Sequence, residues 1–161
     1  MILYLLRHGV AEDAGPATGF RDEPRALTDD GVARMRRAAR GMLGLGIAPE
    51  LVLSSPLTRC RQTAEIVADV LGVPMEEDAQ LAPGMELDDL RQAIGERGSP
   101  DIVLACGHQP DLSVVASDLI GGGAVEFRKG SLAVIEIEAV RSARGHLRAL
   151  YPPATLRQLG R

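Results

Sequence analysis

Three short apolar segments of the chain, at 1–6, 51–53 and 102–106, each end in residues suited to phosphate chemistry. Neutral histidine is a nucleophile, and arginine binds oxyanions through paired hydrogen bonds. Glycine lets the backbone approach a ligand closely. The residues that follow the three segments are, in order, Arg7-His8-Gly9, then Ser54-Ser55-Pro56 with Arg59 shortly after, and Gly107-His108.

The three apolar segments are typical of strands that are buried on both faces of a sheet. In open α/β sheets, ligands bind beyond the carboxyl ends of parallel strands. If these strands are neighbours, Arg7, His8, Arg59 and His108 converge on one rim of the sheet. Helices that begin just after the second and third strands would aim unpaired backbone N–H groups at the same place. We therefore expect an anion site at this rim.

Arg59 supports an anion site for a second reason. It lies in the first turn of a predicted helix, where a cation opposes the helix dipole at a cost of about 0.3–1 kcal/mol. An anion bound between the helix end and the guanidinium would offset this cost. The alternative is that Arg59 simply extends into solvent, and for Arg61 we expect solvent exposure or a salt bridge.

A metal site is the main rival interpretation of His8 and His108. Zinc would need a third protein ligand, and Cys106 lies only two residues before His108. Arginine side chains beside a dication are unfavourable, so we expect no metal and no cofactor. His146 lies in a polar stretch and is expected at the surface.

The remaining segments alternate between strand-like and helix-like patterns, which favours an α/β fold with helices covering a mostly parallel sheet. Thr28 is a candidate helix cap, and Ser55 followed by Pro56 predicts a hydroxyl cap with proline at the first helical position. Further helices are predicted around Leu87–Ile94 and after Pro110. Residues 13–27 are predicted to form a loop, and further strands are expected at 73–76, 132–137 and 147–150.

Composition bounds the function classes. The 161 residues predict one domain over 1–161, which can bury roughly 70% of the surface of its unfolded chain. A net charge of −4, with two tyrosines, two phenylalanines and no tryptophan, disfavours nucleic-acid binding. The first apolar run is too short for a signal peptide or a membrane span. Cys60 and Cys106 do not make a disulfide framework, so we expect a cytoplasmic protein without a membrane partner.

The motifs resemble those of the histidine phosphatase superfamily, which includes the phosphoglycerate mutases. Within it, the short length and the run at 107–113 are similar to the SixA-type phosphohistidine phosphatases, as are Pro24–Thr28 and Phe127–Gly130. The resemblance covers nearly the whole chain and implies a three-layer α/β/α sandwich, phosphoglycerate mutase-like. The segments that carry it are Leu6-Arg7-His8-Gly9, the run from Ser54 to Thr63, and Gly107-His108.

The resemblance also implies roles. His8 would be the nucleophile that accepts the phosphoryl group, while Arg7, Arg59 and His108 bind its oxygens. Arg25 stands where this branch carries a further arginine, with a solvated loop cation as the alternative. No metal is required, because the arginines and His108 supply positive charge. The expected phosphate pocket comprises Arg7, Arg25, Arg59, His108, Gly9 and Gln109.

The chain departs from the superfamily at the carboxylic acid that protonates an alcohol leaving group. Residues 81–87 offer no clear match, and the candidates are Glu86, expected in the first turn of a helix, and Glu12, expected in a loop. Without a firm acid, alkoxides should leave slowly, whereas the imidazole of a phosphohistidine leaves more easily. We therefore expect a phosphorylated histidine-containing protein as partner, within phosphorelay signal transduction.

Two alternatives stay open. One is a general phosphatase for small phosphorylated molecules, with Glu86 or Glu12 as the acid. The other is a module that binds phosphorylated partners without catalysis, which the intact His8 disfavours because binding alone needs no nucleophile.

Overall fold

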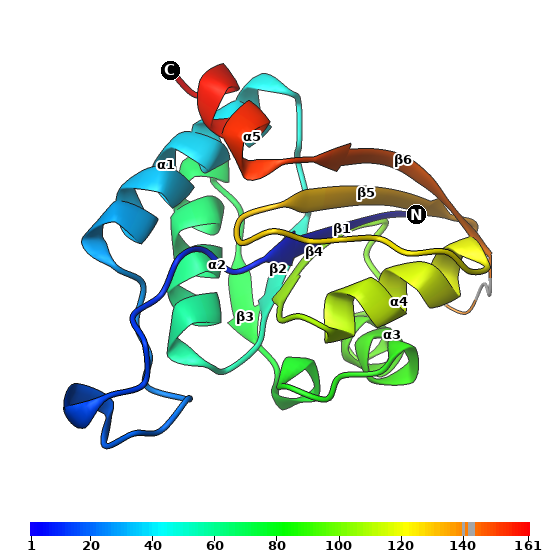
Figure 1. The fold of residues 1–161 in the computed structure, drawn as a ribbon. Coiled ribbons are helices and arrows are strands. Elements are labelled where there is room, and N and C mark those ends of the chain that lie inside the picture. The colour runs from blue at the N-terminus through cyan, green and yellow to red at the C-terminus, as the bar shows by residue number, and fades with distance from the viewer. Residues whose placement is uncertain (140, 142–143) are drawn as a thin grey trace.

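The computed structural model describes residues 1–139, 141 and 144–161. These residues form an α/β fold around a mixed six-stranded sheet with the order β3-β2-β4-β1-β5-β6 (Figure 1). The strands are β1 (Ile2–Arg7), β2 (Leu51–Ser54), β3 (Met75–Glu77), β4 (Ile102–Gly107), β5 (Leu132–Ile137) and β6 (Gly145–Tyr151). Strands β3, β2, β4 and β1 are parallel, and β5 runs antiparallel to both β1 and β6.

Helices cover both faces of the sheet, which gives the three layers. The helices are α1 (Asp29–Gly44), α2 (Thr58–Leu71), α3 (Leu87–Gly95), α4 (Asp111–Ile120) and α5 (Pro153–Leu159), with short 3-10 turns η1 (Pro16–Thr18) and η2 (Ala79–Leu81). Successive side chains of a strand point to opposite faces. Leu3 and Leu5 therefore pack in the cluster with α3 and α4, whereas Tyr4 and Leu6 pack with α1, α2 and α5.

Most of the predicted elements are confirmed. The Thr28 hydroxyl accepts a hydrogen bond from the Gly31 N–H and caps α1, and Gly72 ends α2 in the left-handed conformation that glycine favours. The strand expected at 132–137 is β5 with the same bounds. Exposed His146 lies on the edge strand β6.

Two local predictions differ from the structure, and one helix was not predicted. Helix α2 begins at Thr58, after Leu57, and not at Ser55-Pro56; the Ser55 hydroxyl accepts from the Leu57 N–H in the turn before the helix and also lies 2.7 Å from His108 Nε2. The third strand occupies 75–77 instead of 73–76. Helix α5 was not predicted, because its seven residues are too few to display a clear apolar period.

Helix α5 packs against α1 with close approach of the two backbones. A Cβ atom added to Gly41 would overlap the Leu156 carbonyl oxygen, so the crossing needs glycine at this position. Leu156 is fully buried in the same cluster as β1. The chain end is therefore anchored beside α1 (Figure 1). No helix among the described residues is long and apolar enough to cross a membrane.

Candidate active site

The sheet brings the three motif-bearing segments together at one edge. Strand β1 pairs with β4 so that Arg7 lies opposite Gly107, and the His8 N–H donates to the Gly107 carbonyl over 3.2 Å. The residues that follow both strands are therefore neighbours. The ring centroids of His8 and His108 are 5.6 Å apart, at an interplanar angle of 57°. Both imidazoles are buried at the carboxyl ends of parallel strands.

His8 is held as a neutral imidazole with a defined tautomer. Its Nδ1 lies 2.7 Å from the Gly9 carbonyl oxygen, which can only accept, so Nδ1 carries the proton. Its Nε2 accepts from Arg59 Nε over 3.2 Å. Burial lowers the pKa of His8 to about 3; the Gly9 hydrogen bond opposes this shift, and the charge of Arg59 adds to it. The Nε2 lone pair is therefore free of a proton at neutral pH and faces a cation.

His108 has the opposite tautomer. Arg59 Nη2, which can only donate, lies 3.2 Å from His108 Nδ1, so Nδ1 accepts. Nε2 then carries the proton and donates to Ser55 Oγ over 2.7 Å. Ser55 is fully buried directly after β2, and its backbone N–H donates to the Cys106 carbonyl of β4. A fixed hydroxyl thus orients His108, with Nδ1 toward the site.

Arg59 links the two histidines. It lies in the first turn of α2 and is only 6% exposed, so the interpretation as a solvated cation is not what the structure shows. The Arg59 backbone carbonyl accepts a hydrogen bond from Thr63 Oγ1. Thr63 Oγ1 in turn accepts from the Gly9 N–H. Thr63 therefore ties α2 to the backbone that follows the nucleophile. Arg61, by contrast, is half exposed and pairs with Glu65 and Glu77.

Arg7 supplies a second cation with an unused donor. Its Nη1 donates to the Phe127 carbonyl over 2.7 Å, while its Nε is buried and has no hydrogen-bond partner within the described part of the chain. Burial lowers the pKa of Arg7, and the charge of nearby Arg59 lowers it further. Two guanidinium groups at close range and an orphaned buried donor are the features of an anion pocket.

Asp22 is the carboxylate that sequence reasoning missed. Its Oδ2 accepts from Arg59 Nη2 over 3.0 Å, and its Oδ1 accepts from Arg25 Nη1 over 2.9 Å. Partial burial would raise the pKa of Asp22, but hydrogen bonds from Arg25 and Arg59 outweigh it and lower the pKa. Asp22 thus links Arg25 to Arg59, and Arg25 makes no direct hydrogen bond to either histidine among the described residues. The available signal was an acidic residue three positions before an arginine in a loop.

The two acid candidates make no contact with the central side chains: within the described residues, neither the Glu12 nor the Glu86 side chain is hydrogen-bonded or ion-paired to His8, His108 or Arg59. The Glu12 carbonyl accepts from Arg25 Nε over 2.6 Å, so the Glu12 backbone lies beside Arg25, whereas Glu86 precedes α3 and caps it. Gln109 uses its amide nitrogen to reach the Ser113 hydroxyl. Gly9 lies against Met35, and its carbonyl and N–H fix the His8 ring and Thr63.

Both cysteines lie beside the site and carry free thiols. Cys60 Sγ is 3.4 Å from His108 Nε2, and Cys106 Sγ lies 3.6 Å from the Cys60 carbonyl oxygen. Burial alone would raise the pKa of Cys60, but the hydrogen bonds to Cys106 and His108 outweigh it and lower the pKa. In the parts of the chain that the structure describes, no group of three or more His, Cys, Asp or Glu residues could hold a metal ion.

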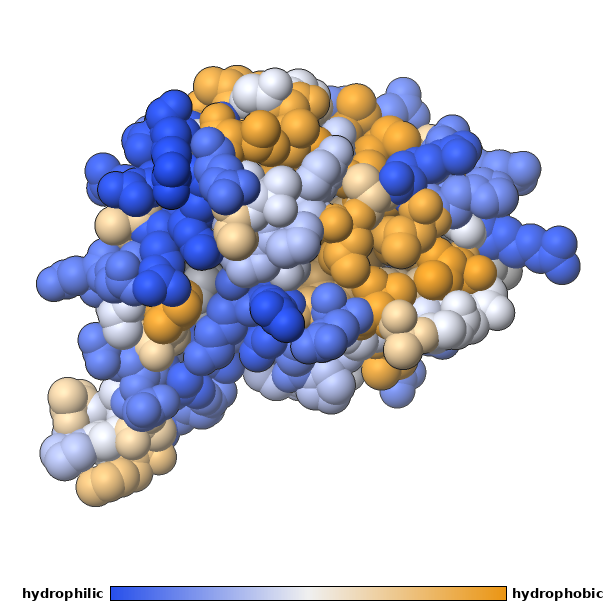
Figure 2. All heavy atoms as spheres, turned by 45° about the horizontal axis from the view of Figure 1, so that its top comes forward, coloured by the Kyte–Doolittle hydropathy of each residue, from blue (hydrophilic) through white to orange (hydrophobic). Residues whose placement is uncertain are grey.

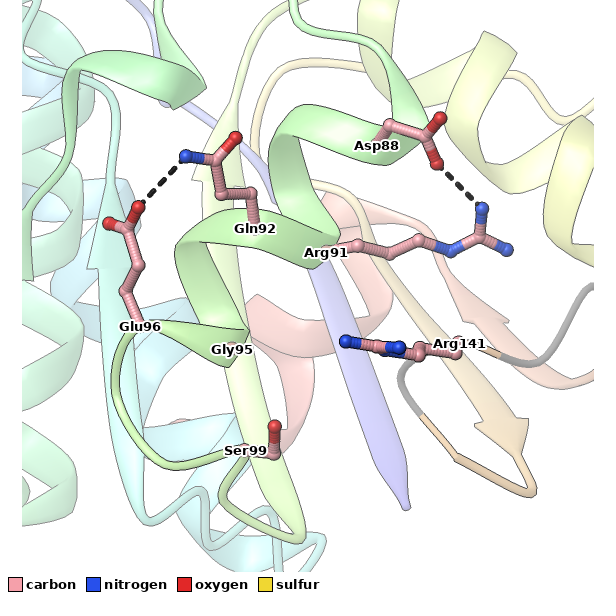
Figure 3. Close-up of a pocket in the computed structure, with 7 residues that line it drawn as sticks. All are labelled: Asp88, Arg91, Gln92, Gly95, Glu96, Ser99 and Arg141. Carbon is pink, nitrogen blue, oxygen red and sulfur yellow. Dashed lines mark hydrogen bonds and ion pairs between the residues drawn. The ribbon is translucent and has the colours of Figure 1, made fainter.

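A hollow lined by α3 lies away from this site. It has a volume of about 640 Å³ and lies at the carboxyl end of α3, close to the residues that precede β4. His8 and His108 follow β1 and β4, so this hollow is at the opposite end of the strands. Figure 3 shows that polar side chains in its wall bond to each other: Arg91 pairs with Asp88, and the Gln92 amide donates to Glu96. Ligands of such sheets bind at the other end.

Comparisons with known proteins show which family this chain resembles. Residues 3–83 match the family described as Histidine phosphatase superfamily (branch 1). An uncharacterized protein of Picosynechococcus sp. is 38% identical over 125 residues, which are 76% of this chain and 74% of that protein. A 2,3-bisphosphoglycerate-dependent phosphoglycerate mutase of Beijerinckia indica is 31% identical over 107 residues, or 59% of this chain and 51% of the mutase. The chain thus spans about half the length of that mutase.

Among solved structures, the protein histidine phosphatase SixA complexed with tungstate is similar over nearly the full length. The two chains superpose with a TM-score of 0.83 and are 27% identical, over 97% of this chain and 99% of the other.

Proposed function

The chain belongs to the histidine phosphatase superfamily, and we propose that it removes phosphate from phosphohistidine in proteins through a phosphorylated His8. The observation that carries the proposal is the state of His8. Its Nε2 lone pair is unprotonated, buried and aimed at Arg59, with His108 alongside. An unprotonated imidazole next to fixed cations is what nucleophilic attack on a phosphoryl group requires.

In the first step, the Arg59 Nε–H leaves His8 Nε2 for a phosphoryl oxygen, and the freed Nε2 lone pair attacks phosphorus in line with the bond to the leaving group. The phosphoryl oxygens bind to Arg7 Nε, which has no partner in the described structure, and to the Arg59 guanidinium. The P–N bond of the substrate breaks as the Nε2–P bond forms. The departing imidazole keeps the electron pair and takes a proton from water.

In the second step, a water molecule attacks phosphorus from the side opposite His8. The Nε2–P bond breaks, its electron pair returns to His8, and the surplus proton of the water passes to solvent. The Gly9 carbonyl keeps Nδ1 protonated throughout, so the leaving nitrogen is always Nε2. Inorganic phosphate is released, and the neutral nucleophile is restored without a metal.

The carboxylates of the site favour phosphohistidine over alkyl phosphates. Asp22 is the one carboxylate with a described contact to Arg59, and the hydrogen bonds that lower its pKa keep it ionised at neutral pH. An ionised carboxylate cannot protonate an alkoxide. Imidazole is a better leaving group and does not need that acid.

The similar proteins support different parts of this proposal. The structure with the SixA name binds tungstate, an oxyanion of phosphate-like shape, and shares 27% identity with this chain. The mutase relatives share 31% identity over 59% of this chain, which supports the phosphohistidine chemistry and leaves the substrate open.

The test is phosphate release from a protein phosphorylated on histidine, with a metal chelator present throughout. We expect release by the wild-type protein and at least a thousandfold slower release by His8→Ala, about the loss seen when a nucleophile is removed. Quenching without acid should trap phosphate on His8. Unchanged release by His8→Ala would refute the proposal, and rapid hydrolysis of alkyl phosphates would favour a general phosphomonoesterase.

A further inference from the structure

A second, smaller hollow adjoins the candidate active site. Its volume is about 130 Å³, and its wall combines the segment after β1, helix α1, the loop before β5 and helix α5. Three cationic side chains from three different elements line it. These are Arg34, Lys129 and Arg157, and we call the site they define the basic hollow.

The basic hollow shares backbone with the nucleophile. Gly9 and Gly130 both belong to its wall. Gly9 directly follows His8, and the Gly130 N–H donates to the carbonyls of both Arg7 and His8 over 3.1 Å. A group bound in the hollow would therefore lie next to a substrate whose phosphoryl group is on His8.

Two of the three cations have no anionic partner. Arg34 pairs with Asp30 over 2.6 Å and is half exposed. Lys129 and Arg157 make no hydrogen bond or ion pair with any residue that the structure describes, and neither Asp nor Glu lines the hollow. Like charges that converge without a counter-ion repel each other, and an anion placed between them relieves the repulsion.

This local charge contrasts with the chain as a whole. The net charge is −4, and Lys129 is the single lysine in the sequence. Figure 2 shows strongly hydrophilic residues gathered on the side of the molecule where α1 lies, and apolar residues gathered toward the side of β5 and β6. Arg34, Lys129 and Arg157 therefore gather at one hollow of a molecule whose net charge is negative.

We propose that the basic hollow is a second anion subsite, which binds a carboxylate side chain next to the phosphohistidine of a protein substrate. The inference rests on the proposed function and deepens it by naming an acidic surface as the feature recognised. Gly9 and Val10, which follow His8, belong to the wall of the hollow, so the carboxylate would come from a residue that neighbours the phosphohistidine in the substrate protein.

The test compares two peptides that carry a stable phosphoryltriazole analogue of phosphohistidine. One has glutamates at three positions on each side of the analogue, and the other has glutamines there. We expect the wild-type protein to bind the glutamate peptide about tenfold more tightly, since two or three partly exposed ion pairs contribute modestly each. High salt should reduce this preference.

The Lys129→Gln/Arg157→Gln double variant should bind both peptides equally. Arg36→Gln removes an exposed cation of α1 outside the hollow and should keep the preference. Equal binding of both peptides by the wild type, or an unchanged preference in the double variant, would overturn the subsite. Binding of neither peptide would contradict the proposed function as well. If 2,3-bisphosphoglycerate, instead of the glutamate peptide, depended on Lys129 and Arg157, the occupant would be a second phosphate and the carboxylate assignment would fail.

Discussion

Arg59 donates from Nε to Nε2 of His8 over 3.2 Å, while the Gly9 carbonyl accepts from Nδ1 on the other side of the ring. The two contacts fix the tautomer and the direction of the lone pair before any substrate arrives. They also place the permanent charge of Arg59 next to the position that the phosphoryl oxygens must occupy. The nucleophile is thus held in one tautomer before the substrate binds, and its Nε2 becomes free to attack when the Arg59 Nε–H turns to a phosphoryl oxygen.

The depressed pKa of His8 predicts an acid-sensitive stability. The unfolded chain binds a proton on this residue below about pH 6.5, whereas burial keeps it unprotonated in the folded protein down to about pH 3. The unfolded state is therefore favoured as the pH falls through this window. Relative to His8→Asn, the free energy of unfolding of the wild type should fall by about 2 kcal/mol between about pH 7.5 and pH 5.

Urea denaturation at several pH values measures this difference. The matched control is His146→Asn, because His146 is an exposed histidine on β6. Its difference from the wild type should not change over the same range. A His8→Asn difference that is equally flat would mean that folding does not lower the pKa of His8.

The Ser55 hydroxyl predicts a positioning role. Ser55→Ala removes the acceptor of the His108 Nε2 proton, so a buried N–H loses its partner and the tautomer of His108 is no longer fixed. We expect a stability loss of about 1–3 kcal/mol and a fall in kcat of about tenfold. The control is Ser54→Ala, whose buried hydroxyl donates to the Ser55 carbonyl and contacts neither histidine. Equal losses of kcat in both variants would show a general packing effect.

The parallel part of the fold could be predicted because its signals are local. Strands β1, β2 and β4 are short apolar runs, and a parallel sheet buries such runs on both faces. The caps of α1 and α2 are set by Thr28 and Gly72 at their own positions. The convergence of His8 and His108 follows from the rule that ligands bind at the carboxyl ends of strands.

The contacts that tune the site could not be predicted, because they join residues distant in sequence. Asp22 meets Arg59 only after a loop folds back across the start of α2, where the Thr58 N–H donates to the Glu23 carbonyl. Ser55 looked like a helix cap because the Ser-Pro pair fits that pattern. Its contact with His108 depends on the pairing of β2 with β4.

Close packing under the nucleophile predicts a glycine requirement in α1. A Cβ atom at Gly31 would overlap the Val10 carbonyl oxygen, which belongs to the segment that follows His8 and Gly9. Gly31→Ala should therefore displace this segment, lower the stability by about 2 kcal/mol or more and reduce kcat. Gly44→Ala in the same helix meets open space and should leave stability unchanged or raise it by up to about 1 kcal/mol. Thermal unfolding with activity assays checks both, and a harmless Gly31→Ala would contradict the packing argument.

Asp22 predicts opposite effects on phosphate affinity and turnover. Its carboxylate neutralises part of the charge on Arg59 and Arg25, and it also repels an incoming phosphate. Asp22→Asn keeps the shape and removes the charge, so inorganic phosphate should inhibit about threefold more tightly, an effect below about 1 kcal/mol for a half-exposed pair. Turnover should fall, because the arginines lose the charged partner that aligns them. Steady-state kinetics separates the two effects, with Asp13→Asn on the same exposed loop as the control. Weaker phosphate inhibition in Asp22→Asn would mean that Asp22 holds the pocket open, with its repulsion of phosphate unimportant.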